Sequence, residues 1–480
     1  MTAAQNTPAP PTQHAEQPEH GIADDAGFSL VEVMVALFVF ALLSTGTAYT
    51  VLSVIQLDRD SRARHVAANL AAEEIDLARD AASVMALTDV TRPAQRVGGD
   101  LFHVVVKTAW VSATGTDDAC GATGGTLLYK RINVEVRWDN QRGGSSPVRA
   151  DTVITPNSHL NSPDSGTILV RVLGTSGSGV SGVGITATPS AVANGATSSA
   201  NATTDSQGCA FLTRLTPGNY SVTATAADHF DSMAQASSPV ATVPVVAGYS
   251  AGASFSYDRA SQFTLTYAPT ATPTVPAGAV YLPRNLDTSY LAADGRVTVA
   301  SLTGSGTNTT RTLTASLFPF ASGYEVIAGV YTADASCLSI DPAAWAPVTE
   351  AGVVLTGTRT KVASSPGESV AGTVPMGILT VTGLAPGANL TAVSAAAPAS
   401  TGDPGCTRAT TYAFGAVPSG STIALPFGSW TLHSTAATAP GAAVPGSTVP
   451  GATVPGSAIT LGSRGSVAAT VITLDPRVAP

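Results

Sequence analysis

A single carboxylate at the start of a long apolar segment is the group with the clearest chemical meaning in this chain. Glu32 ends the sequence Gly-Phe-Ser-Leu-Val-Glu at residues 27–32, and from Val33 to Leu57 there is no Asp, Glu, Lys, Arg or His. These 25 residues are enough to cross a bilayer as a helix. An acidic residue costs about 3 kcal/mol at the centre of a membrane helix and less near its end, so we expect insertion with Glu32 in place.

The motif around this carboxylate is more specific than the simpler explanation, an interfacial acid that the helix dipole favours at a helix start. Gly-Phe-Ser-Leu-Val-Glu followed by a long apolar run resembles the processing signal of type IV pilins and type II secretion pseudopilins. The resemblance implies a prepilin peptidase that cuts after Gly27 and methylates the freed amine of Phe28. It also implies that Glu32 pairs with the N-terminal ammonium of a neighbouring subunit, because in lipid each charge relieves the burial penalty of the other.

The composition favours β structure and disfavours nucleic-acid binding. Of the 480 residues 11% are charged, and the net charge of −9 leaves no basic surface to neutralise phosphates. With 46 Gly and 32 Pro, and with abundant Ser and Thr, the chain is suited to short strands joined by turns. A chain of this length should form several domains.

No constellation of residues in the sequence indicates catalysis. Residues 177–182, Gly-Ser-Gly-Val-Ser-Gly, match a dinucleotide-binding pattern, but a strand and not a helix is expected after them, which favours a hairpin loop. The His residues are scattered without metal-ligand spacing, and no Ser or Cys has the setting of a nucleophile. We therefore expect no enzyme activity, no cofactor and no metal site.

The four cysteines are Cys120, Cys209, Cys337 and Cys406, and none has the spacing of a metal ligand. In an external setting they permit two disulfides with three connectivities. We favour a bond between Cys337 and Cys406, with buried free thiols as the alternative.

Residues 1–27 are polar and Pro-rich, and they predict a disordered leader that is cleaved off. The leader holds four acidic residues and no Lys or Arg, whereas three Arg follow the apolar run within residues 59–64. The positive-inside rule would keep the C-terminal part in the cytoplasm. We expect it outside, because long domains translocate largely regardless of flanking charge.

Residues 28–157 predict a pilin-like unit, in which a helix from residue 28 to about 82 packs on an antiparallel sheet. Val66, Leu70 and Leu77 belong to an amphipathic stripe that Glu74 interrupts. Segments at 101–111, 127–138 and 148–155 predict three strands. The first places Phe102 and Val104 on one face and His103 on the other, and the second alternates more cleanly. Residues 44–47, Ser-Thr-Gly-Thr, are poor helix formers and predict a locally loose turn like that of similar pilins in filaments.

The rest of the chain predicts tandem β-sandwiches. Residues 158–257, with a turn at 205–208 and Pro-Gly before Tyr220, resemble the carboxypeptidase regulatory-like (transthyretin-like) sandwich, a non-catalytic module. Tyr220, Tyr324 and Trp430 follow similar turns and are 104 and 106 residues apart. Unless this recurrence is chance, it predicts two more sandwiches at 258–347 and 348–480. A Val-Pro-Gly repeat at 438–458 predicts an exposed loop in the last.

These features predict an α+β pilin-like N-terminal part followed by tandem all-β sandwiches. We expect a structural subunit, a large minor pilin or pseudopilin that is rare or tip-located, in a type IV pilus or type II secretion-like filament. Its partners would be the prepilin peptidase, other pilin or pseudopilin subunits, the membrane and an extracellular ligand. It would span the cytoplasmic membrane once before assembly and reach the cell surface afterwards. The alternative is a single-pass surface binding or adhesion protein whose helix is an uncleaved anchor.

Overall fold

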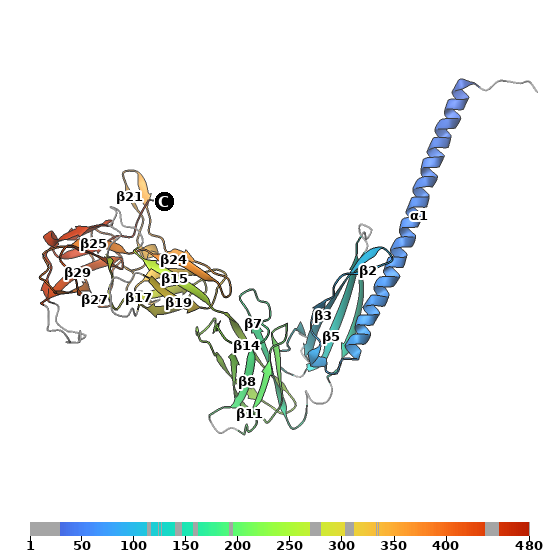
Figure 1. Ribbon diagram of the computed structural model, residues 1–480, viewed down its shortest axis with the longest axis horizontal. Coiled ribbons are helices and arrows are strands. Elements are labelled where there is room, and N and C mark those ends of the chain that lie inside the picture. The colour runs from blue at the N-terminus through green and yellow to red at the C-terminus, as the bar shows by residue number, and fades with distance from the viewer. Residues whose placement is uncertain are drawn as a thin grey trace, which may run out of the picture.

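A long helix and a series of β domains follow one another in chain order along an extended molecule (Figure 1). The computed structural model describes residues 29–479, apart from 113–116, 123, 126, 140–145, 157–161, 192–194, 269–279, 303–311, 333, 335 and 437–450. The helix stands at one end, and the sheets after it form sandwich-like domains. The predicted fold class, one N-terminal helix followed by mostly β structure, is confirmed.

The helix α1 (Leu30–Arg79) is unbroken, including the stretch that the sequence predicts to be loose in a filament. There the Thr45 hydroxyl donates to the Ala41 carbonyl at 2.7 Å, and the Thr50 hydroxyl donates to the Gly46 carbonyl at 2.8 Å. These bonds give the hydroxyl groups partners inside the helix. In the single chain this stretch therefore remains helical without help from a neighbour.

A six-stranded antiparallel sheet, with the order β1-β3-β5-β6 and with β2 and β4 also paired to β3, forms the head domain together with the C-terminal half of α1. Its elements are η1 (Val84–Ala86), β1 (Val90–Thr91), β2 (Gln95–Val97), β3 (Asp100–Ser112), β4 (Asp117–Asp118), β5 (Leu127–Trp138) and β6 (Val148–Ile154). Ala63, Ala67 and Ala71 of the helix are buried against Phe102 and Ile132 and their neighbours in the sheet. The predicted core face of β3 is confirmed, whereas Leu77, which the stripe places toward the sheet, is 53% exposed.

The acidic residue inside the helical stripe has a cationic partner. Arg92, just beyond β1, donates from Nε to Glu74 Oε1 at 2.7 Å and from Nη2 to Oε2 at 3.0 Å. Two parallel bonds of this kind are the strongest way in which a guanidinium holds a carboxylate. Glu74 therefore contributes to the contact between helix and sheet, at a position where the pattern favours an apolar residue.

The first sandwich, residues 166–259, consists of two four-stranded sheets with the orders β10-β7-β14-β12 and β13-β11-β8-β9. Its strands are β7 (Gly166–Leu173), β8 (Gly184–Pro189), β9 (Ala200–Thr203), β10 (Cys209–Leu215), β11 (Gly218–Thr225), β12 (His229–Asp231), β13 (Val240–Val245) and β14 (Ser250–Arg259). The predicted turn precedes β10: Gly208 N donates to Asp205 O at 3.0 Å. Gly208 has a φ of 76°, a conformation that favours glycine.

The same strand arrangement recurs in a second and a third sandwich. The second contains β15 (Ser261–Tyr267), β17 (Asp287–Ala292), β18 (Val297–Ser301), β19 (Thr312–Leu317), β20 (Tyr324–Ala328), β23 (Thr360–Val362) and β24 (Ser369–Val374). The third contains β25 (Gly377–Val381), β26 (Asn389–Ser394), β27 (Thr411–Ala416), β28 (Ser421–Leu425), β29 (Gly428–Thr435), β30 (Ala452–Thr453), η3 (Gly456–Ala458), β31 (Ile459–Leu461), β32 (Gly465–Ala468) and β33 (Val471–Leu474). In all three, the opening strand pairs with β10, β19 or β28, and the next strand lies between two others, as in β9-β8-β11, β18-β17-β20 and β27-β26-β29.

A buried aromatic residue marks the equivalent strand, β11, β20 or β29, of each sandwich. In each case the polar tip of the ring donates to a carbonyl in the turn before the strand. The three bonds are Tyr220 Oη to Thr216 O at 2.8 Å, Tyr324 Oη to Phe318 O at 2.7 Å, and Trp430 Nε1 to Pro426 O at 2.9 Å. The spacing noted in the sequence therefore corresponds to one repeated structural element.

The second sandwich continues beyond residue 347, where the sequence places its end. β23 pairs with β20, and β24 pairs with β15, so both belong to the second sandwich. The hairpin of β21 (Val348–Glu350) and β22 (Val353–Leu355) and the turn η2 (Pro342–Ala344) precede them. The third sandwich begins at β25, and it also receives β16 (Val280–Tyr281), which pairs with β28. Strand pairing, which the aromatic spacing does not encode, decides where one sandwich ends.

Most of the Val-Pro-Gly segment lies outside the described residues, so its predicted exposure is described only for its last unit. There the expectation of an exposed loop is wrong for Val454, which is buried, and whose N–H donates to Leu432 O at 2.8 Å. The backbone bond to β29 holds this unit against the third sandwich.

Candidate functional site: the apolar half of the N-terminal helix

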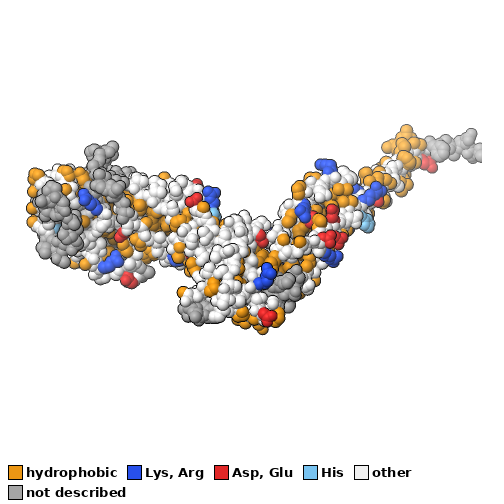
Figure 2. Space-filling view, turned by 60° about the horizontal axis from the view of Figure 1, so that its bottom comes forward, with side chains coloured by type: hydrophobic (Ala, Val, Ile, Leu, Met, Phe, Trp, Pro, Cys, Tyr) orange, Lys and Arg blue, Asp and Glu red, His pale blue; other side chains and the backbone are white. Residues whose placement is uncertain are grey.

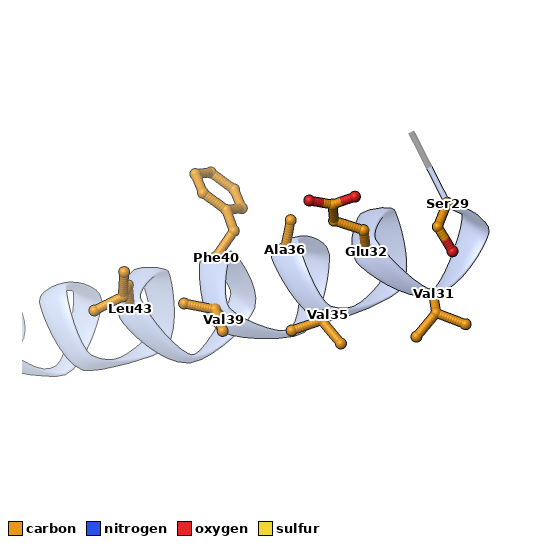
Figure 3. A pocket seen from close by; sticks show the side chains of 8 residues that line it. All are labelled: Ser29, Val31, Glu32, Val35, Ala36, Val39, Phe40 and Leu43. Atoms are coloured by element: carbon orange, nitrogen blue, oxygen red, sulfur yellow. The ribbon is translucent and has the colours of Figure 1, made fainter. Parts of the chain in front are cut away.

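Glu32 is the one charged residue in a shallow apolar groove along the start of α1 (Figure 3). The groove is lined by Ser29, Val31, Glu32, Val35, Ala36, Val39, Phe40 and Leu43. Glu32, Ala36 and Phe40 project from the same side of the helix, as their spacing of four requires. None of the described residues that line the groove is a cation, so any charge partner of this carboxylate lies outside the groove.

The helix around Glu32 exposes apolar side chains along its whole first half. Leu30 is 76% exposed, Val33 46% and Leu57 51%. No residue in the most apolar stretch of α1 is buried, and α1 has the length and composition of a membrane-crossing helix. Figure 2 shows hydrophobic side chains gathered at this end of the helix. A surface of this kind requires lipid or other protein to cover it.

A band of paired charges follows the apolar segment. Arg62 Nη2 lies 2.6 Å from Asp58 Oδ2, and Arg64 Nη2 lies 3.6 Å from Asp60 Oδ2. The two residues of each pair are one turn apart on α1. Arg59 binds Asp100, a nearly buried side chain at the start of β3. The band therefore marks the point where the helix leaves its exposed apolar half and joins the head domain.

The processing positions inferred from the sequence, Gly27 and Phe28, lie outside the described residues. The helix begins two residues after Phe28, and Glu32 N donates to Ser29 O at 2.9 Å. The Ser29 side chain makes no capping bond, and Glu32 is the acidic residue of the first turn. A negative charge there is favoured by the helix dipole, which agrees with the simpler explanation of Glu32 as well as with a paired one.

The cysteines form two disulfides, and none of the four is free in the described chain. Cys337 is bonded to Cys406, the pair that the sequence analysis favours, and the bond joins loops of the second and third sandwiches. Cys120 of the head is bonded to Cys209 of the first sandwich. No spacing in the sequence indicates this second bond.

Lys130 is a buried charge that the sequence analysis did not single out. It lies on β5 in the register of Ile132 and Val134, whose side chains are in the head core. Its Nζ donates to Leu87 O and lies 5.3 Å from the centre of the Trp110 ring. Burial lowers the pKa of Lys130 to about 8, although Asp205 and Asp89 oppose the shift. The alternation of β5 alone was sufficient to place Lys130 on the core face.

The groups that could indicate catalysis are dispersed in the described residues. Residues 177–182 form a loop that leads into β8 and not into a helix, as expected. His103 Nε2 lies 3.2 Å from Asp139 Oδ1 on an exposed surface. His433 Nδ1 lies 3.1 Å from the backbone carbonyl oxygen of Gly451. Within the described chain no group of three or more His, Cys, Asp or Glu could hold a metal ion.

Residues 22–48 match the family described as the prokaryotic N-terminal methylation motif. The matched segment contains Gly27, Phe28 and Glu32 and the first turns of α1. The chain has no significant match among curated proteins.

Similar solved structures include the Bacillus anthracis TIE protein and two streptococcal pilins. The Bacillus anthracis TIE protein is 12% identical over 77% of this chain and 73% of its own, with a TM-score of 0.18. A streptococcal ancillary pilin is 11% identical over 51% and 75%, with a TM-score of 0.19. A minor pilin of Streptococcus agalactiae is 12% identical over 44% and 94%, with a TM-score of 0.17. Scores this low carry no argument about assembly or ligand.

A methylation motif on an exposed helix of membrane-crossing length, followed by β domains, supports a pilin-type surface subunit.

Proposed function

We propose that this chain is a non-enzymatic structural subunit, a large minor pilin or pseudopilin, of a type IV pilus or type II secretion-like filament. The observation that carries the proposal is Glu32: a carboxylate among apolar side chains, in a groove without a cation, inside a matched methylation motif. The exposed half of α1 would lie in the membrane before assembly and in the filament core afterwards.

The processing step supplies the missing cation. A prepilin peptidase would hydrolyse the Gly27–Phe28 peptide bond, leaving a carboxylate on Gly27 and a free amine on Phe28. The amine would then take a methyl group from a sulfonium methyl donor, which leaves as the thioether while the amine nitrogen gives up a proton. The methylated amine keeps its positive charge. In a filament the ammonium of one subunit would bind Glu32 of its neighbour, and this pairing would set the register between subunits.

The β domains would be displayed outside the cell. A subunit with three sandwiches behind its head is bulky for a repeated shaft, which favours a rare or tip position and a role in adhesion or binding. The first sandwich, with its turn at 205–208 and its tyrosine-marked strand β11, is the module proposed to be carboxypeptidase regulatory-like.

The direct test removes the Glu32 carboxylate. Glu32→Ala is expected to insert into the membrane and to be processed, but to be lost from purified filaments by at least tenfold. Glu73→Ala is the matched control, because Glu73 is exposed on the same helix beyond the apolar half. Equal amounts of both variants in filaments, measured by quantitative immunoblotting, would contradict the proposal.

The acidic leader without Lys or Arg favours a second candidate, a single-pass surface binding protein with an uncleaved anchor. Mass spectrometry of the N-terminus separates the two. A chain that begins with methylated Phe28 supports the filament subunit, and an intact leader of residues 1–27 supports the anchor.

A further inference from the structure

The head domain and the first sandwich are joined by a disulfide and by a shared apolar contact. Trp110 and Leu127 of the head pack with Leu169 of β7, and Phe211 of β10 lies against this cluster. The bond between Cys120 and Cys209 crosses the same junction.

Backbone contacts close this junction further. Gly125 N donates to Ser250 O at 2.7 Å, and Ser250 N donates back to Gly125 O at 3.0 Å. At Gly252 of β14 a Cβ atom would lie 1.6 Å from Ala122 O, so only glycine lets the head loop approach the strand this closely. The head and first sandwich therefore form one body, which we call the proximal body.

The second and third sandwiches form another single body. One hydrophobic cluster runs from Phe263 to Leu474 without a break between the two. Asn285, beside β16, donates to Thr411 O at 2.8 Å and accepts from Ala413 N at 2.9 Å. The bond between Cys337 and Cys406 crosses this junction as well. We call the pair of sandwiches the distal body.

The contact between the two bodies has a different character. Among the described residues no buried apolar cluster spans it, and neither disulfide crosses it. Gln235 Nε2 donates to Tyr324 Oη at 3.0 Å, and Gln235 Oε1 accepts from Phe318 N at 2.8 Å. Arg296 of the distal body donates to Ser232 O at 2.7 Å.

The chain crosses this junction through one residue, Ala260, between β14 and β15. Ala260 N donates to Asp228 O at 2.7 Å, and Gly367 N donates to Arg259 O at 3.2 Å beside it. Asp228 and Gln235 have φ values of 56° and 53°, a left-handed backbone conformation that residues other than glycine seldom adopt. A conformation of this kind persists only where the surrounding contacts hold it in place.

We infer that the molecule is built from two rigid bodies that swing about Ala260, and that Gln235 is the latch that holds them in one orientation. A few residues at the end of an element are sufficient to absorb such a motion. Polar contacts that water can replace hold the bodies weakly, whereas the other two junctions combine a disulfide with a buried apolar contact.

Distances between spin labels on the full-length protein in detergent micelles test this hinge. Labels on an encoded ketone amino acid leave the four cysteines in their disulfides. The labels occupy four exposed positions, one in each domain: Val153, Val240, Val299 and Thr460. The Val153–Val240 distance reports on the junction between the head and the first sandwich. The Val240–Val299 distance reports on the junction between the first and second sandwiches, and the Val299–Thr460 distance on that between the second and third.

Gln235→Ala is expected to at least double the width of the Val240–Val299 distance distribution and to leave the other two pairs unchanged. Arg296→Ala, the second variant, should widen the same pair. Gln207→Ala is the matched control, because Gln207 is also half-buried and accepts a hydrogen bond from Thr108 at 3.3 Å, but across the disulfide-bonded junction. It should widen none of the distributions. A Val240–Val299 distribution that neither hinge variant widens, or equal widening of all three pairs, overturns the inference.

Discussion

The two halves of α1 are one continuous helix, but only the second half packs on the head sheet, and the first half is exposed. The first half exposes its apolar side chains and carries Glu32 without a cation in its groove. The second half is buried through alanines, and its one acidic residue in the stripe, Glu74, is held by Arg92. A charge whose partner is inside the chain serves the fold, and a charge without one is available to another molecule.

Lys130 extends the comparison, since it is a cation among apolar side chains that has its partner inside the chain. The Leu87 carbonyl and the Trp110 ring therefore give Lys130 its partners within the proximal body.

The largest effect on stability should come from the disulfide of the proximal body, the head and first sandwich. Replacing both Cys120 and Cys209 by Ser removes a link between residues 89 apart, which should cost about 4 kcal/mol by the loss of loop-closure entropy. Amide exchange in β5, followed by mass spectrometry, should become about 1,000-fold faster. The double Ser variant of Cys337 and Cys406 is the control and should leave β5 unchanged. Unaltered exchange in β5 of the first variant would show that the junction does not stabilise the head.

Lys130 should make the stability of the proximal body depend on pH. Its pKa in the folded chain is about 8, below the ordinary value of 10.5, so between these values the unfolded chain binds more protons. The free energy of unfolding should therefore rise from pH 8 to 10.5, by about 3 kcal/mol. Lys130→Met keeps the other titrating groups, and the difference between the two proteins in urea unfolding isolates this contribution. A difference that is constant with pH would mean that the lysine is solvated.

Added volume should distinguish the two halves of the helix. Ala71→Leu places a larger side chain in the closely packed contact with the sheet and should destabilise the head by about 2 kcal/mol. Ala41→Leu makes the same change in the exposed half and should leave the urea midpoint of the head where it is. Equal effects of both variants would indicate that the first half of the helix also packs on the chain.

The smallest effect should come from the two acidic residues. Glu74→Gln weakens a partly exposed pair with Arg92 and should lower the stability of the head by about 1 kcal/mol. Glu32→Gln removes the charge that has no such partner and should change head stability by less than about 0.5 kcal/mol. Thermal unfolding followed by near-UV circular dichroism compares the two. A destabilised Glu32→Gln head would reveal an internal partner for this carboxylate.

Local patterns in the sequence predict much of this fold. Alternation places Phe102 and Val104 in the core, and the turn at residues 205–208 follows from its Asp and Gly. The aromatic spacing indicates a repeat because the same turn and strand recur. These features depend on neighbours within a few residues, which a sequence displays directly.

Other features depend on contacts between distant segments, and the sequence does not predict them. The pairing of β24 with β15 extends the second sandwich past residue 347, and β16 joins a sandwich that begins well after it in the chain. Leu77 belongs to the helical stripe by periodicity, but its side chain is half-exposed. The candidate site was more accessible to prediction, because Glu32 and its apolar surroundings are contiguous in sequence.

The sequence by itself determines where a membrane-length helix lies and that one carboxylate interrupts its apolar start, since hydropathy and charge are properties of consecutive residues. Only the tertiary structure decides that Cys120 meets Cys209, that Lys130 binds the Leu87 carbonyl, and that two of the domain junctions carry a disulfide while the junction at Ala260 carries none among the described residues. Those outcomes require whole domains to be placed against one another, and a domain's position depends on the summed packing of many distant residues.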